Sequence, residues 1–114
     1  MSPRVAAIIT FADDDLRQLC STERLAKRRI GSKNTKKLKA RLADLQVAAN
    51  VSQLVAGRPH PLKGDRAGQF ALDLDGGCRL VFAPANDTAT AAGGVIDWSK
   101  VTEVKVLEIG DYHD

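Results

Sequence analysis

The sequence is poor in the residues that most metal and redox sites require. It has two histidines and two cysteines in 114 residues, and Cys20 and Cys78 do not form a CxxC pair. It contains no HExxH motif and no acidic residues at calcium-loop spacing, so a zinc or calcium site is not supported. Neither a P-loop nor a GxGxxG motif occurs, which argues against a nucleotide cofactor. We therefore expect no metal and no cofactor.

Long hydrophobic runs are also missing. No apolar segment approaches the roughly 20 residues of a membrane span, and the short run after Arg4 leads into three aspartates rather than a signal-peptidase site. We expect no membrane association, a cytoplasmic location, and buried free thiols rather than a disulfide for the two cysteines. The length predicts one domain covering residues 1–114.

Negative charge is scarce in the first part of the chain. Residues 1–66 carry 14 Lys and Arg against 6 Asp and Glu, whereas residues 67–114 carry 3 against 8. Between Arg24 and Arg41, 9 of 18 residues are basic and none is acidic. Such an excess indicates a polyanionic partner such as nucleic acid, although a solvated helix face has the same pattern.

Apolar spacing in this first part predicts one strand and two helices. Residues 5–11 are a short β-branched run typical of a buried strand. Asp13 to Asp15 suit the first turn of a helix, which we expect to continue until Gly31. Ser32 is a good N-cap for a second helix, whose apolar residues recur at helical spacing.

The apolar period changes to two in the second part. Residues 70–74 and 79–82 read as a hairpin joined by Asp75-Gly76-Gly77, and residues 101–109 as a last strand. In that strand we expect Val104 and Val106 on one side, with Glu108 as a candidate for the same side. Residues 95–98 read as a short strand extension. The order predicts an α+β domain with two N-terminal helices on one face of a mostly antiparallel sheet. The predicted core contains Leu38, Leu42, Leu45, Phe70, Leu72, Leu80, Phe82, Val104 and Val106.

The segment from Arg58 to Arg66 joins these parts. Its sequence, RPHPLKGDR, holds a histidine, a lysine and two arginines, and its prolines exclude a helix interior or a central strand. We expect a stiff, exposed loop. The other histidine and the single tyrosine are at the C-terminus, in Asp111-Tyr112-His113-Asp114.

These residues suit RNA cleavage without a metal. Histidine can move protons near neutral pH, and lysine or arginine can stabilise the extra charge of a phosphorane. A loop histidine and a terminal histidine without any catalytic role remain the alternative at this point.

The segment His60 to Arg66 (HPLKGDR), together with Arg79-Leu80-Val81-Phe82 and the terminal Asp-Tyr-His, resembles the HigB branch of the RelE/ParE toxin superfamily. These are the toxins of type II toxin–antitoxin modules, also described as plasmid-maintenance killer proteins. The resemblance covers nearly the whole chain. It implies a compact microbial-RNase-like fold with a curved sheet, and ribosome-dependent cleavage of mRNA.

The resemblance also implies roles for individual residues. The catalytic group would comprise His60, His113, Tyr112, Asp111 and Lys63. The residues that contact phosphate or 16S rRNA would be Arg66, Arg79, Arg58, Lys27, Arg28, Lys36, Lys37 and Lys39. The partners would be the ribosome, its mRNA and a HigA-like helix-turn-helix antitoxin, through which the chain would contact DNA only indirectly.

Two positions depart from the resemblance. Cys78 stands where many members have an aromatic residue, and Phe70 replaces a tryptophan or tyrosine. With aromatics at 4% of the chain, base stacking would be sparse. Two other function classes therefore stay open, a ParE-like gyrase poison and a non-enzymatic RNA- or partner-binding module.

Overall fold

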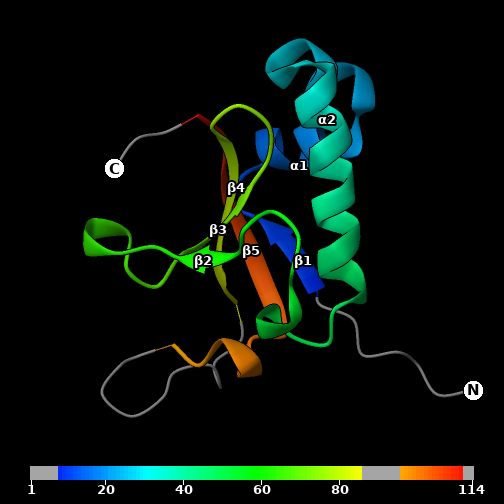
Figure 1. The fold of residues 1–114 in the computed structure, drawn as a ribbon. Helices are drawn as coiled ribbons and strands as arrows, with labels where there is room; N and C mark the ends of the chain where they lie inside the picture. Colours follow the sequence, from blue (N-terminus) through cyan, green and yellow to red (C-terminus); the bar gives the residue numbers. More distant parts are fainter. Residues whose placement is uncertain (1–7, 86–95, 112–114) are drawn as a thin grey trace, which may run out of the picture.

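The computed structural model describes residues 8–85 and 96–111 and shows two helices packed on one face of a five-stranded sheet (Figure 1). The predicted α+β class and the placement of both helices are confirmed. In chain order the elements are β1 (Ile8–Phe11), α1 (Asp14–Ser21), α2 (Glu23–Val47), β2 (His60–Pro61), β3 (Phe70–Asp73), β4 (Cys78–Pro84) and β5 (Glu103–Asp111), with single 3-10 turns η1 (Val51–Gln53), η2 (Gly64–Arg66) and η5 (Trp98–Lys100).

The sheet has the strand order β1-β5-β4-β3-β2. β1 pairs with β5 in parallel, and the remaining pairs are antiparallel, as expected for a mostly antiparallel sheet. The first and last strands of the chain are therefore neighbours. Consequently β5 lies in the interior of the sheet, where its C-terminal half faces β4.

The helical part contains one break that was predicted and one that was not. Gly31 has φ 86° and ψ 164°, so it interrupts α2 at the residue where the sequence predicts a stop. The first helix, however, already ends at Ser21, because Thr22 is extended with φ −120° and ψ 104°. The expectation of one helix up to Gly31 is therefore wrong. At the start of α1 the Asp13 side chain accepts a hydrogen bond from the Leu16 amide, 2.8 Å away.

The core lies between the helices and the sheet. Every predicted core residue belongs to it, with Leu42 only partly buried at its margin. The Phe70 ring contacts those of Phe82 and Trp98, with centroids 5.6 and 4.6 Å apart. Trp98 does not extend a strand, as the sequence suggested, but begins η5 and packs against the core. Both cysteines are free thiols; Cys78 is buried and Cys20 is partly buried.

A bulge in β5 changes which side chains face the core. Val81 pairs with Glu108, but its neighbour Phe82 pairs with Val106, so Leu107 is an extra residue on β5. The alternation that puts Val104 and Val106 in the core is shifted by one residue beyond this point. Ile109 then packs against the core, and Glu108 lies on the opposite face. The expected grouping of Glu108 with the two valines is wrong for this reason.

Within the described residues, no helix is long and apolar enough to cross a membrane.

Candidate RNA-binding and catalytic face

The side of the sheet away from α1 and α2, termed the open face, carries most of the charged residues of the strands. Core residues alternate along β3 and β4, so the residues between them must point the other way. Asp73 on β3 and Arg79 on β4 are direct partners on this face, and Glu108 joins them from β5 beyond the bulge.

The segment from Arg58 to Arg66 folds onto the open face. It was predicted to be a loop, but His60 and Pro61 form a two-residue strand at the edge of the sheet, with His60 opposite Ala71. Prolines are tolerated at a sheet edge because no neighbouring strand needs their missing N–H. The segment then turns outward and projects from the side of the sheet opposite to α2 (Figure 1).

Leu62 attaches this projecting segment to the sheet. It is buried against Ala71 and Val81, which form a small second hydrophobic cluster on the open face. Its backbone N–H donates to the Gln69 carbonyl at 2.9 Å, which closes the base of the projection. The buried Leu62 side chain thus fixes the segment between His60 and η2 to the sheet.

Two carboxylates that the sequence analysis did not single out hold the predicted arginines. Arg66 Nη2 donates to Glu108 Oε1 at 2.7 Å, and Arg66 Nη1 donates to Gln69 Oε1 at 3.1 Å. Asp73 lies between Arg58, whose Nε is 2.8 Å from Oδ2, and Arg79, whose Nε is 3.2 Å from Oδ1.

The contact of Asp73 with Arg79 is an ion pair without hydrogen-bond geometry, whereas its contact with Arg58 is a true hydrogen bond. The alternation of Asp73 with core leucines was the sequence signal for its position on the open face. No comparable signal existed for Glu108, because the bulge determines where it points.

His60 is oriented by the backbone of Arg58. Its Nδ1 lies 2.8 Å from the Arg58 carbonyl oxygen. Arg58 has φ 48°, the one positive φ recorded for a non-glycine residue in the described part of the chain, and it precedes a proline. Such a conformation costs about 1–3 kcal/mol and persists only where surrounding contacts enforce it.

The structure describes only part of the remaining predicted catalytic group. Lys63 is exposed, and no acidic side chain pairs with it within residues 8–85 and 96–111. β5 ends at Asp111, whose backbone lies opposite Cys78 and therefore next to Arg79. Tyr112 and His113 follow directly in the chain but lie outside the described residues.

The two departures from the resemblance bear on the core rather than on RNA stacking. Phe70 and Cys78 are both 6% exposed and both belong to the core beneath the helices. A side chain at either position points away from the open face. The identity of these two residues therefore bears on core packing, while the expectation of sparse base stacking, drawn from an aromatic content of 4%, stays a prediction.

The basic stretch from Arg24 to Arg41 lies along α2, and four of its nine cations are ion-paired inside the domain. Lys39 and Lys27 lie 2.9 and 3.1 Å from Glu23. The hydrogen bond from Lys39, followed by that from Lys27, holds the pKa of the Glu23 carboxyl below its usual range. The other two pairs are Arg29 with Asp15 and Arg41 with Asp44.

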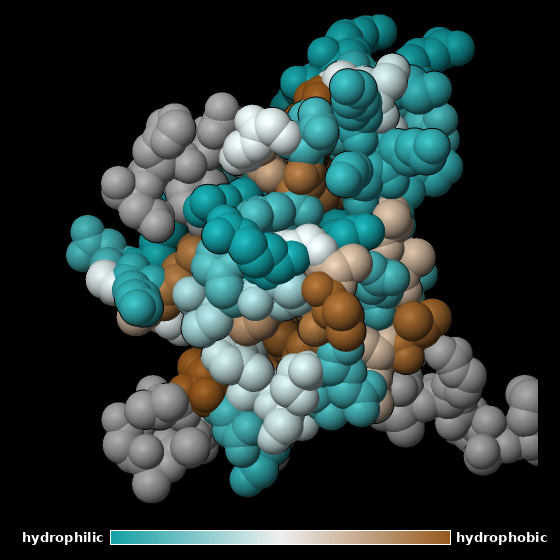
Figure 2. Space-filling view, in the orientation of Figure 1, coloured by the Kyte–Doolittle hydropathy of each residue, from teal (hydrophilic) through white to brown (hydrophobic). Residues whose placement is uncertain are grey.

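Five cations of the stretch remain without an acidic partner among the residues that the structure describes. They are Arg24, Arg28, Lys33, Lys36 and Lys37, all exposed. Figure 2 shows mainly hydrophilic side chains at this end of the molecule, where α1 and α2 meet. Of the five predicted contacts on α2, Arg28, Lys36 and Lys37 are therefore available to an anion, whereas Lys27 and Lys39 share their charge with Glu23.

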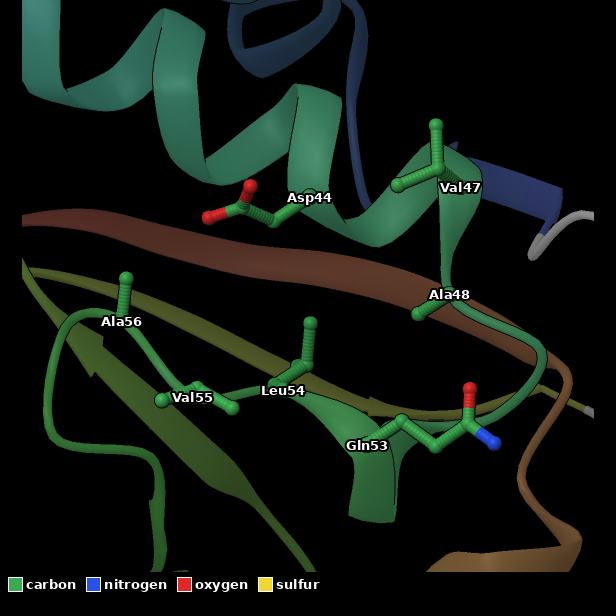
Figure 3. Close-up of a pocket in the computed structure, with 7 residues that line it drawn as sticks. All are labelled: Asp44, Val47, Ala48, Gln53, Leu54, Val55 and Ala56. Atoms are coloured by element: carbon green, nitrogen blue, oxygen red, sulfur yellow. The ribbon is translucent and has the colours of Figure 1, made fainter.

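A separate apolar hollow of about 360 Å³ lies at the C-terminal end of α2 (Figure 3). Asp44 and Val47 of α2, with Ala48 directly after it, face residues 53–56 across the hollow. Val47 and Val55 are exposed here, at 64% and 85%, and hydrophobic side chains gather around this end of α2 in Figure 2. None of the predicted catalytic or RNA-binding residues lines this hollow.

Comparison with known proteins supports the fold. No protein-family profile and no curated protein matches the chain. Among solved structures, a YoeB/ParE toxin from Agrobacterium tumefaciens superposes with a TM-score of 0.57 at 15% identity, over 95% of this chain and 99% of that one. The chain has the fold of a YoeB/ParE toxin. A YoeB dimer from Staphylococcus aureus matches with a TM-score of 0.53 at 19% identity, over 95% and 98% of the two chains.

Proposed function

We propose that this chain is the toxin of a type II toxin–antitoxin module and that it cleaves mRNA on the ribosome without a metal. The observation that carries the proposal is that His60 lies at the edge of the open face, while Arg66 bonds Glu108 and Arg79 lies opposite Gly110 near the end of β5. Arg79 comes from a different strand than the segment from His60 to Arg66, and the sheet brings it to the same face as that segment. The likeness to solved YoeB/ParE toxins over nearly the whole chain supports it.

The open face can divide the reaction among its residues. One histidine takes the proton of the RNA 2′-hydroxyl while the 2′-oxygen attacks phosphorus, and the other protonates the leaving 5′-oxygen. Lys63 and the arginines stabilise the charge of the phosphorane. Tyr112 assists at the 2′-hydroxyl, and Asp111 orients a neighbouring group. The products are a 2′,3′-cyclic phosphate and a 5′-hydroxyl.

The arginines are ion-paired before RNA arrives. Glu108 and Asp73 neutralise Arg66, Arg79 and Arg58 in the absence of a phosphate. A phosphate with two oxygens accepts from a guanidinium as a carboxylate does, so RNA would compete for the same donors. The carboxylates keep the arginines extended and pointed at the open face in the meantime.

The macromolecular partners follow from charge and from the resemblance. The unpaired cations of α2 would contact 16S rRNA, while the open face takes the mRNA. A HigA-like helix-turn-helix antitoxin would neutralise the chain and would provide its indirect link to DNA.

The test is single-turnover cleavage of an mRNA on programmed ribosomes by the purified chain. We expect cut mRNA whose new ends are a 2′,3′-cyclic phosphate and a 5′-hydroxyl. His60→Ala and His113→Ala should each reduce the rate. Ends carrying a 3′-hydroxyl and a 5′-phosphate would contradict the mechanism. Intact mRNA together with DNA breaks in the presence of gyrase would favour the gyrase-poison alternative. If the mRNA stays intact and no DNA breaks form, the binding module is favoured.

A further inference from the structure

The turn that precedes His60 is held by Asp73 at two points. The Asp73 N–H donates to the Gly57 carbonyl at 2.6 Å, and the Asp73 carboxylate accepts from Arg58 Nε at 2.8 Å. Gly57 and Arg58 have consecutive positive φ values of 86° and 48°. A residue before proline is ordinarily extended, so the conformation of Arg58 needs such external contacts.

This turn presents one atom to the imidazole. The Arg58 carbonyl oxygen lies 2.8 Å from His60 Nδ1. A carbonyl oxygen can only accept a hydrogen bond, so Nδ1 must carry the proton. In the neutral ring the lone pair is then on Nε2. Free histidine in water prefers the opposite tautomer, so the contact with the Arg58 carbonyl has to select the form with the proton on Nδ1.

We infer that Asp73 is a positioning residue, which holds the Gly57–Arg58 turn so that the Arg58 carbonyl fixes the tautomer of His60 and leaves Nε2 to exchange the proton with RNA. The inference rests on the proposed function for its catalytic meaning. In either proton transfer the ring begins and ends with a proton on Nδ1, and only the Nε2 proton moves. Asp73 acts through Arg58 and touches neither the ring nor the RNA.

The position of Asp73 in the sheet suits this role. β2 contains only two residues and forms the edge of the sheet, so its own pairing restrains His60 weakly. Asp73 belongs to β3, which is paired on both sides by β4 and β2. β3, an inner strand, thus restrains the edge histidine through one carboxylate and one amide of Asp73.

The ion pair of Asp73 with Arg79 makes cleavage rate an ambiguous readout, because losing Asp73 also disturbs an arginine of the open face. Measuring the tautomer of His60 in the RNA-free protein avoids this ambiguity, because that readout does not depend on how Arg79 binds RNA. Arg58→Gly adds a rescue, since glycine adopts positive φ without strain and needs no ion pair to hold it.

The experiment is a long-range ¹H–¹⁵N spectrum of the full chain labelled with ¹⁵N-histidine, in a His113→Ala background that leaves His60 as the sole histidine. At a pH where the ring is neutral we expect protonated Nδ1 and unprotonated Nε2. Asp73→Ala should lower the ratio of the Nδ1–H to the Nε2–H form by roughly tenfold, the effect of losing one net hydrogen bond. Adding Arg58→Gly to Asp73→Ala should restore the ratio, and Asp65→Ala should leave it unchanged.

Protonated Nε2 in the otherwise unaltered chain would overturn the inference, as would an unchanged ratio in Asp73→Ala. If Asp73→Ala does not fold, Asp73→Asn serves instead, with a smaller drop expected and an unchanged ratio counting against the inference. The predicted tautomer in a chain that cuts no mRNA would support the hydrogen-bond assignment and overturn the proposed function, so the two failures are distinguishable.

Discussion

The guanidinium of Arg66 and the carboxylate of Glu108 lie 2.7 Å apart on the open face, although 42 residues separate them in the chain. The pair exists because a bulge rotates Glu108 out of the core. Both side chains are about one-third exposed, at 32% and 39%, so RNA can reach the pair.

Glu108→Gln should strengthen RNA binding while slightly weakening the fold. Removing the negative charge weakens the competition of residue 108 with a phosphate for Arg66, and a partly exposed ion pair is worth about 0.2–1 kcal/mol. Affinity for ribosomes, measured by filter binding, should rise by up to about fivefold. The free energy of unfolding in urea should fall by less than about 1 kcal/mol. The matched control is Asp14→Asn, which breaks the exposed Arg17 pair on α1 and should leave affinity nearly unchanged. A loss of ribosome affinity in Glu108→Gln would contradict competition between the Glu108 carboxylate and RNA phosphate for Arg66.

His113→Ala should reduce single-turnover mRNA cleavage by roughly 10²–10⁴-fold, the usual contribution of a general acid or base. Ribosome binding and antitoxin binding should persist, because we assign those contacts to other residues and the substitution removes only an imidazole. Asp114→Ala is the neighbouring control and should cut at a rate close to that of the unaltered chain. Equal rates for His113→Ala and Asp114→Ala would remove His113 from the mechanism.

The unpaired cations of α2 should matter more for ribosome binding than the paired ones. Neutralising Lys33, Lys36 and Lys37 to Gln should weaken binding steeply and reduce the slope of log affinity against log salt by roughly 1 per lost phosphate contact. Neutralising Lys27 and Lys39 should reduce ribosome affinity less for each charge removed, because Glu23 already offsets their charge. Circular dichroism checks that both variants fold. A binding constant independent of salt would refute the role of this surface.

Gly57→Ala should destabilise the protein more than Gly64→Ala. Both glycines have positive φ, which costs an alanine about 1–2 kcal/mol. At Gly57 the added Cβ would also lie 3.0 Å from Arg41 Cδ and 3.1 Å from the Asp73 carbonyl oxygen, whereas at Gly64 nothing lies within 4 Å. We expect a loss of roughly 2–4 kcal/mol for Gly57→Ala, overpacking included. Equal losses of unfolding free energy for Gly57→Ala and Gly64→Ala in urea would show that the turn at Gly57 can shift to accommodate the added Cβ.

The Cys20 thiol should resist alkylation in the folded protein. Burial raises the pKa of Cys20 from 9.0 to about 11, so the thiolate is scarce at pH 8. Labelling by iodoacetamide, followed by mass spectrometry, should accelerate strongly in urea. Because the folded pKa is the higher one, the contribution of this thiol to stability is present below pH 9 and is lost as the pH rises toward 11. Rapid labelling at pH 8 without urea would contradict the burial of the thiol.

The sequence by itself determined the layers of this protein. The change from helical to two-residue period, the core leucines and valines, and the stop at Gly31 follow from local spacing and backbone preferences, and the structure agrees with each. The charge asymmetry and the concentration of basic groups in residues 58–66 could also be read directly. These features depend on residues close together in the chain, so local physics suffices to predict them.

Tertiary structure decided how the candidate site is assembled. Strict alternation put Glu108 with the core valines, and one extra residue in β5, set by the pairing of β5 with β4, moved it to the other face. The pairing of His60 with Ala71 and the meeting of Arg58, Arg79 and Asp73 likewise depend on strand order and register. Register is fixed by packing between strands that are distant in the sequence. The sequence therefore indicated candidate residues for the site, whereas the ion-pair partners of its arginines could not be predicted from local spacing.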